Sequence, residues 1–235
     1  MFDVPSDFPV MMVDRWVTPV SNIPAQSSGN MHIVKRVIPA GGTLDLYPES
    51  ERGVVFQRDT ELTILRHGSA TDTDTESVWM SDTPMEYFSA WELVSRIRPP
   101  KVLVVGLGLG LLVQLLALRR DVTHIDIVEI NLDVVNMVSP YLPCYEGQHV
   151  TVHHTDFFEL AADHPCVETE YDTVIGDIWK GRDKRSKEKM LEFKHHAEQD
   201  WMDAKLLVWA FQKEHEEAMA VRWYNWNVHR KRGKE

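Results

Sequence analysis

Apolar and polar positions are patterned differently on the two sides of residue 80. Before it, short runs mix apolar and polar side chains, as strands of a half-exposed sheet do. These runs cover 31–38, 43–47, 53–57 and 62–65. Turn-forming residues such as Gly41 and Gly42 separate them. The pattern predicts a small antiparallel β-region over residues 1–80.

A helix is expected to follow this β-region. Thr83 is a candidate N-cap, Pro84 suits the first helical position, and Glu86 has the spacing of a capping box. Apolar residues then recur at helical intervals, at Tyr87, Trp91, Val94 and Ile97. The prolines at 99–100 end the helix.

From residue 101 onward, predicted strands alternate with predicted helices. The strands are 102–105, 125–128, 150–153, 173–175 and 206–209, and the helices are 111–118, 132–138 and a charged, exposed one over 182–200. Such alternation is typical of a parallel sheet with helices on both faces. We therefore expect a Rossmann-like doubly wound α/β domain over residues 81–235. No further strands follow, so the sheet is expected to stop at five or to be completed by another chain in a homo-oligomer.

The formal net charge of −11 argues against a nucleic-acid partner, because an acidic surface repels phosphate. It suits a small cationic acceptor, although the excess acid can equally serve solubility alone. The aromatic and basic tail at 223–234 could bind nucleic acid, but a packing helix with a solvated end explains it better.

Cysteine usage and the terminus predict a cytoplasmic protein. Cys144 and Cys166 have neither a CxxC spacing nor a histidine at metal-ligand spacing, so no metal site is expected. The amino-terminal segment lacks a basic stretch followed by an apolar run, so it does not resemble a signal peptide. No apolar stretch is long enough to span a membrane.

The strongest chemical signal is a glycine turn between the strand 102–105 and the next helix. Gly106, Leu107, Gly108 and Gly110 form a GxGxG pattern, in which glycine permits a tight turn and close ligand approach. A dinucleotide-binding GxGxxG motif would instead need glycine at Leu111. The spacing favours the loop of S-adenosylmethionine enzymes. A tight turn without any ligand is the alternative.

Glu129 closes the strand after this turn, where a carboxylate can accept hydrogen bonds from both ribose hydroxyls. Ile130 and Asn131 follow and belong to the same predicted cofactor-binding segment, with Asn131 beside the adenine. The alternative for Glu129 is a solvated carboxylate at a strand end.

Asp156 and Phe157 follow the third strand, where the carboxylate could accept a hydrogen bond from the adenine amine and the ring could pack on the base. The alternative for Asp156 is an N-cap of the next helix. Both roles are compatible, because a carboxylate has several lone pairs.

Asp177 is the candidate catalytic residue. It ends the fourth strand, which should lie beside the first strand at the point where strand order reverses and ligands bind. Asp177 could bind the cofactor and orient or deprotonate an amine, while Trp179 could line the acceptor site. The alternative is a carboxylate that only orders its loop. His153 and His154 are adjacent on a strand and cannot jointly hold one metal.

Several of these motifs together resemble the spermidine synthase-like branch of class I S-adenosylmethionine-dependent transferases. The resemblance covers roughly positions 30 to 211 and rests on segments 80–86, 102–110, 127–129, 154–156 and 171–177. It implies S-adenosylmethionine or its decarboxylated form as cofactor, and a small amine as acceptor. Glu86 and Tyr87 are the approximate counterparts of the family's polyamine-binding residues.

Two departures from the polyamine synthases shape the functional hypothesis. Their GGGDG-type loop has an aspartate that segment 106–110 lacks, and the family's D-S-S-D-P segment is matched only at Asp177. Methyl transfer to a small acceptor is therefore the leading hypothesis. Aminopropyl transfer and a catalytically inactive binding or assembly protein are the alternatives.

Overall fold

The computed structural model describes residues 10–45, 53–68, 77–143, 145–160, 164–179 and 184–209. Its centre is a five-stranded parallel sheet with strand order β10-β9-β8-β11-β12. The strands are β8 (Lys101–Val105), β9 (His124–Glu129), β10 (His149–His154), β11 (Thr173–Gly176) and β12 (Lys205–Val208). Strand order reverses between β8 and β11, as in a Rossmann-like sheet. The predicted fold class is confirmed.

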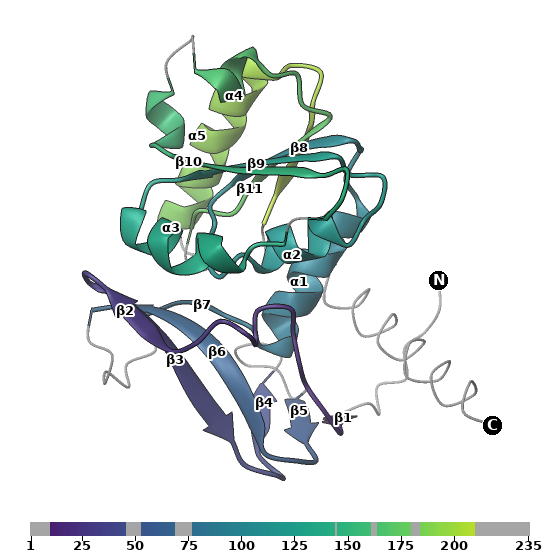
Figure 1. Cartoon of the computed structure of the whole chain (residues 1–235), viewed down its shortest axis with the longest axis vertical. Helices are drawn as coiled ribbons and strands as arrows, with labels where there is room; N and C mark the ends of the chain where they lie inside the picture. Colours follow the sequence, from purple (N-terminus) through teal and green to yellow (C-terminus); the bar gives the residue numbers. More distant parts are fainter. Residues whose placement is uncertain are drawn as a thin grey trace, which may run out of the picture.

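Helices cover both faces of this sheet (Figure 1). One face carries α1 (Pro84–Ser95), α2 (Leu111–Ala117) and α3 (Leu132–Val138), and the other carries α4 (Pro165–Glu168) and α5 (Lys184–Asp200). In β8, Val102 and Val104 pack into the core on the α1–α3 side, whereas Leu103 and Val105 pack into the core under α4 and α5. Burial on both faces explains why β8 is a continuous apolar run.

The amino-terminal region forms two smaller sheets below α1–α3 in Figure 1. The larger is antiparallel, in the order β2 (Gln26–Ser28), β3 (Met31–Ile38), β6 (Thr60–His67) and β7 (Val78–Ser81). The smaller has the order β1 (Val10–Val13), β5 (Gly53–Phe56) and β4 (Thr43–Asp45), with β1 parallel to β5. The sequence pattern missed β1, β2 and β7. The expected boundary after residue 80 falls inside β7.

The start of α1 differs from the prediction. Pro84 occupies the first turn, but the Thr83 side chain makes no capping hydrogen bond to the helix. Its hydroxyl accepts a hydrogen bond from Ser81 instead. The predicted capping box with Glu86 is therefore wrong. Trp91, predicted on the apolar face, is 43% exposed.

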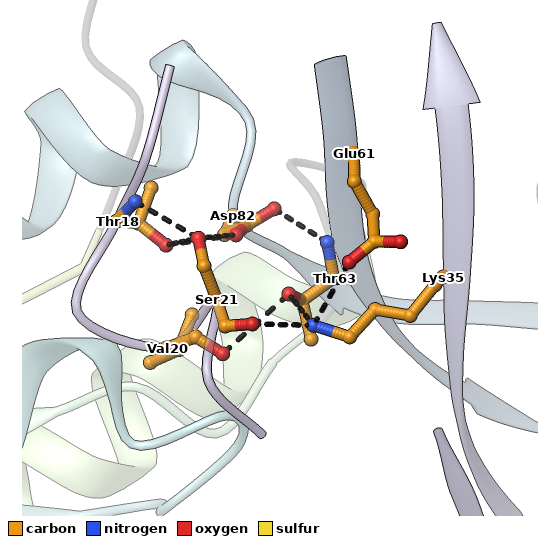
Figure 2. Close-up of polar contacts among 7 residues, drawn as sticks. All are labelled: Thr18, Val20, Ser21, Lys35, Glu61, Thr63 and Asp82. Carbon is orange, nitrogen blue, oxygen red and sulfur yellow. Dashed lines mark hydrogen bonds and ion pairs between the residues drawn. The ribbon is translucent and has the colours of Figure 1, made fainter. Parts of the chain in front are cut away.

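A buried carboxylate fixes the junction between β7 and α1. Asp82 is fully buried and accepts hydrogen bonds from the Thr63 backbone N–H at 2.7 Å and from the Thr18 hydroxyl at 2.8 Å. Figure 2 shows this cluster, in which Lys35 also donates to the Ser21 carbonyl and to the Thr63 hydroxyl. Burial raises the pKa of Asp82, and the hydrogen bonds oppose that rise. The network holds the chain segment that leads from Met80 to Glu86.

The charged helix α5 is anchored by few apolar side chains. Phe193 and Ala197 are fully buried, and the Phe193 ring packs where a Cβ on Gly176 of β11 would stand. The aromatic and basic tail at 223–234 lies outside the described residues. Within the described part, no helix is long and apolar enough to cross a membrane.

Candidate active site

The glycine turn lies at the carboxyl ends of β8 and β11, beside Asp177. The Gly106 N–H donates to the Val128 carbonyl, and the Asp177 N–H donates to the Val105 carbonyl. Gly106 has a φ of +100°, and the Asp177 carbonyl oxygen occupies the space that a Cβ would need. Glycine at 106 therefore lets the two strand ends meet at the switch point.

Glu129 connects the end of β9 to the glycine turn. Its carboxylate accepts hydrogen bonds from the backbone N–H groups of Leu107 and Asn131, both at 2.8 Å. The side chain is only 9% exposed. The glycine turn and the strand-end acid thus meet, as the sequence motif required. Each carboxylate oxygen keeps a further lone pair, so the group can still accept ribose hydroxyls.

The Met80 side chain lies against the glycine turn. Its Sδ lies 3.2 Å from the Leu109 backbone nitrogen and accepts that N–H. The same sulfur lies 2.5 Å from the position of a Cβ on Gly108, whose φ is +52°. The space that we expected a ligand to enter at Gly108 is therefore filled by a side chain from β7. The contact could not be predicted from the sequence, because the strand β7 itself was not predicted.

Asn131 and Asp156 are both helix caps. The Asn131 Oδ1 accepts the N–H groups of Asp133 and Val134 at the start of α3. The Asp156 Oδ1 accepts the Phe158 N–H at the short helix Phe157–Glu159, as the capping alternative expected. A carboxylate that caps a helix with one oxygen can still accept hydrogen bonds with the other.

Phe157 and Ile130 differ strongly in exposure. Phe157 is 3% exposed, and Phe193 and Trp201 pack against its ring at centroid distances of 5.0 and 5.9 Å. It belongs to the core under α5. Ile130 is 63% exposed at the end of β9 and offers an apolar side chain beside Glu129.

Three acidic side chains interact through their charges, Glu129 with Asp177 and Asp177 with Glu86, and we call them the carboxylate row. Asp177 and Glu86 are partly exposed but surrounded by protein. Burial, followed by the charge on Glu129, raises the pKa of Asp177 to about 7. Burial, followed by the charge on Asp177, raises the pKa of Glu86 to about 8. No lysine, arginine or histidine among the described residues offsets either rise.

The carboxylate row has a direct chemical consequence. Neighbouring carboxylates that are partly dehydrated disfavour full ionisation, and a bound cation restores it. The row can therefore hold an ammonium or sulfonium group and can exchange a proton near neutral pH.

Tyr87 and Trp179, the other predicted acceptor-side residues, lie in packed surroundings. The Tyr87 ring makes an edge contact with Trp16 at 5.4 Å, and burial raises its pKa. Trp179 is 8% exposed and donates its Nε1–H to the Trp209 carbonyl at 2.6 Å. Its ring packs against Phe193 rather than standing free at the end of β11.

Comparison with known proteins assigns the family. A sequence model of the spermine/spermidine synthase domain matches residues 85–204, which is about half of the chain. The chain belongs to the spermine/spermidine synthase domain family. The matched segment contains α1 except for its first residue, the glycine turn and the whole carboxylate row.

Two individual proteins are similar to parts of this chain. A polyamine aminopropyltransferase of Streptococcus uberis is 33% identical over 84 residues, which is 34% of this chain. The match spans 28% of that relative's length. The crystal structure of MNMC2 from Aquifex aeolicus aligns at a TM-score of 0.30 and 16% identity, covering 50% of this chain and 46% of that one. The family relationship supports the interpretation of this chain as an aminopropyltransferase-like transferase. Methyl transfer stays a prediction.

Proposed function

We propose that this protein transfers an aminopropyl group from decarboxylated S-adenosylmethionine to a small amine. The observation that carries the proposal is the carboxylate row, which lies beside the glycine turn and has no described basic neighbour to neutralise it. Membership of the spermine/spermidine synthase domain family points to the same chemistry.

The two possible cofactor forms differ in charge, and the site should discriminate between them by that charge. S-adenosylmethionine carries a carboxylate in addition to its ammonium and sulfonium groups, and the decarboxylated form carries only the two cations. A negative ligand group placed near Asp177 or Glu86 would be repelled, because both side chains already resist ionisation beside an acid. The row should therefore select the decarboxylated form.

Each residue of the site has a proposed task. Glu129 accepts hydrogen bonds from the ribose hydroxyls. It uses the carboxylate lone pairs that are not occupied by the backbone N–H groups of Leu107 and Asn131. Asp156 accepts the adenine amine with its second oxygen, and Ile130 lies against the nucleoside. Asp177 and Glu86 bind the ammonium group of the donor and orient the acceptor amine, and Tyr87 and Trp179 line the acceptor side.

The reaction step balances without a metal or redox partner. The lone pair of the acceptor nitrogen attacks the propyl carbon bonded to the sulfonium sulfur. A C–N bond forms, the C–S bond breaks, and its electron pair leaves with the sulfur as a neutral thioether. The acceptor nitrogen loses one proton, which Asp177 can accept because its pKa is about 7. Alignment of nitrogen, carbon and sulfur supplies much of the rate acceleration.

Methyl transfer is the second candidate, and the loop 106–110 favours it. That loop lacks the aspartate that the GGGDG-type loop of the polyamine synthases carries. A cytoplasmic location, a homo-oligomer and the division of the chain after residue 80 also stay proposals, as does the inactive binding protein.

Product analysis tests the proposed reaction. The purified protein is incubated with a panel of linear diamines and triamines and with either donor, and the nucleoside products are identified by mass spectrometry. Aminopropyl transfer releases methylthioadenosine together with an amine heavier by one aminopropyl group. Release of S-adenosylhomocysteine with a methylated amine would favour methyl transfer. Absence of both products, with both donors, would favour the inactive binding protein.

A further inference from the structure

A second cluster of reactive side chains lies outside the carboxylate row. One ligand atom from each of His153, His164 and Cys166 lies within 4.8 Å of the other two. His153 comes from β10, whereas His164 and Cys166 flank the start of α4. The grouping is formed by the fold rather than by sequence spacing, so it could not be predicted from the sequence, where no metal site was expected. We propose that these three residues bind a zinc ion.

The types of ligand atom in this cluster indicate which metal it would bind. Two imidazoles and one thiolate are ligands that zinc prefers, whereas magnesium and calcium prefer oxygen. Zinc bonds of about 2.0–2.3 Å place tetrahedral ligand atoms roughly 3.3–3.8 Å apart. Since the three atoms lie within 4.8 Å of one another, their separations must shorten by at most about 1.0–1.5 Å.

The surroundings of His153 match those of a metal-bound histidine. Its Nε2 lies 3.0 Å from the Asp126 carboxylate, and Asp126 also accepts the Tyr171 hydroxyl at 2.7 Å. A carboxylate on one ring nitrogen orients the imidazole and leaves the other nitrogen for the ion. Asp126 is thus a positioning residue in this site.

The other two ligands are held close together by local structure. The His164 Nδ1 accepts the backbone N–H of Cys166 at 3.2 Å, which places the imidazole beside the thiol. The Cys166 side chain is buried, and its carbonyl accepts the Trp201 indole N–H. His153 and Asp126 keep 17% and 19% of their side chains exposed, so an ion can reach the cluster from their side. Water can supply the fourth ligand.

Cobalt substitution tests this site directly. The tag-free full chain is stripped with a chelator and titrated with Co²⁺, and absorption is recorded. We expect one Co²⁺ per chain, with a thiolate-to-cobalt band in the near ultraviolet and visible bands of a tetrahedral ion. Zinc should displace the cobalt and abolish both signals.

Matched variants assign the ligands. Cys166→Ser should remove the near-ultraviolet band, whereas Cys144→Ser, at the chain's other cysteine, should keep it. His164→Asn should weaken cobalt binding at least ten-fold, and His195→Asn on the exposed face of α5 should not. Asp126→Asn should weaken binding by about 10–100-fold, as expected for a residue that orients a ligand.

The proposal is overturned if the wild-type protein shows no near-ultraviolet band, or if Cys166→Ser retains it. Circular dichroism monitors folding of every variant. If Cys166→Ser fails to fold, the same titration is carried out on His153→Asn and His164→Asn. Unchanged Co²⁺ affinity in both variants would contradict the proposed site. None of these outcomes depends on transferase activity, so the metal site and the proposed function fail separately.

Discussion

The Glu129 carboxylate accepts the Leu107 backbone N–H at 2.8 Å, which joins the end of β9 to the glycine turn. These two features lie 22 residues apart in the sequence and come from neighbouring strands. The contact places an acid beside the loop that would hold an adenosyl donor. Its second oxygen is tied to the Asn131 N–H, so the carboxylate is fixed before any ligand arrives.

Replacing this acid tests its role in donor binding. In Glu129→Gln the amide oxygen can keep one backbone hydrogen bond, but the negative charge is lost. The affinity for decarboxylated S-adenosylmethionine should fall by about 10–100-fold, because a hydrogen bond to a charged group contributes about 1.5–3 kcal/mol. Isothermal titration calorimetry measures the change. Glu198→Gln, at an exposed position on α5, is the control and should bind as the wild-type protein does.

Donor affinity should depend on pH through Asp177 and Glu86. Their pKa values are raised to about 7 and about 8, so both are partly protonated at neutral pH. A dicationic ligand binds the ionised forms and displaces protons. Affinity should therefore increase from about pH 6 to pH 9, by up to about ten-fold per pH unit for each displaced proton. A flat profile in calorimetric titrations would show that these carboxylates do not meet the ligand.

The same raised pKa values predict how the free protein responds to pH. The pKa of Glu86 lies above its ordinary value of 4.5, so the folded state binds its proton more tightly than the unfolded state. Its contribution to stability is fully present below about pH 4.5 and is lost as the pH rises through about 8. Glu86→Gln should therefore raise Tm at pH 8, by at least about 2 °C, and have little effect at pH 4. Differential scanning calorimetry at both pH values provides the test, and an equal effect at both would refute the shift.

The glycine turn predicts a contrast between two substitutions. Gly106→Ala places a methyl group against the Asp177 backbone carbonyl, which cannot move aside, so a loss of more than about 3 kcal/mol is expected. In Gly108→Ala the new methyl group meets the flexible Met80 side chain, which can move aside. The free energy of unfolding should then fall by about 1–3 kcal/mol, because residue 108 has a positive φ.

A double-mutant cycle isolates the Met80 contact. Met80→Ala should relieve part of the cost of Gly108→Ala and none of the cost of Gly106→Ala. Urea denaturation gives each free energy of unfolding. Equal coupling of Met80 to both glycines would contradict the described geometry.

The sequence predicted those parts of the fold that short-range patterns encode. The strand 31–38 and the helix 132–138 match the structure residue for residue, because their apolar positions follow a clear period. The meeting of Glu129 with the glycine turn was also predictable, since parallel strands bring their carboxyl ends to one edge. The short strands β1, β2 and β7 carry too few residues for a recognisable alternation.

Features that depend on long-range packing were not predictable in the same way. Met80 reaches Gly108 only because tertiary packing brings β7 against the glycine turn, and no local pattern encodes that contact. Phe157 follows Asp156 as expected, yet its ring is enclosed by Phe193 and Trp201 from distant segments. Glu86 has the spacing of a capping box, but its environment beside Asp177 is set by tertiary structure.

The most direct test of the account compares the two donor forms by calorimetric titration at pH 8 with the same protein sample. An acidic site beside the glycine turn should bind decarboxylated S-adenosylmethionine at least about ten-fold more tightly than S-adenosylmethionine, since each 1.4 kcal/mol of repulsion corresponds to a factor of ten. Equal affinities, or tighter binding of the carboxylated form, would contradict the claim that the carboxylate row selects the donor.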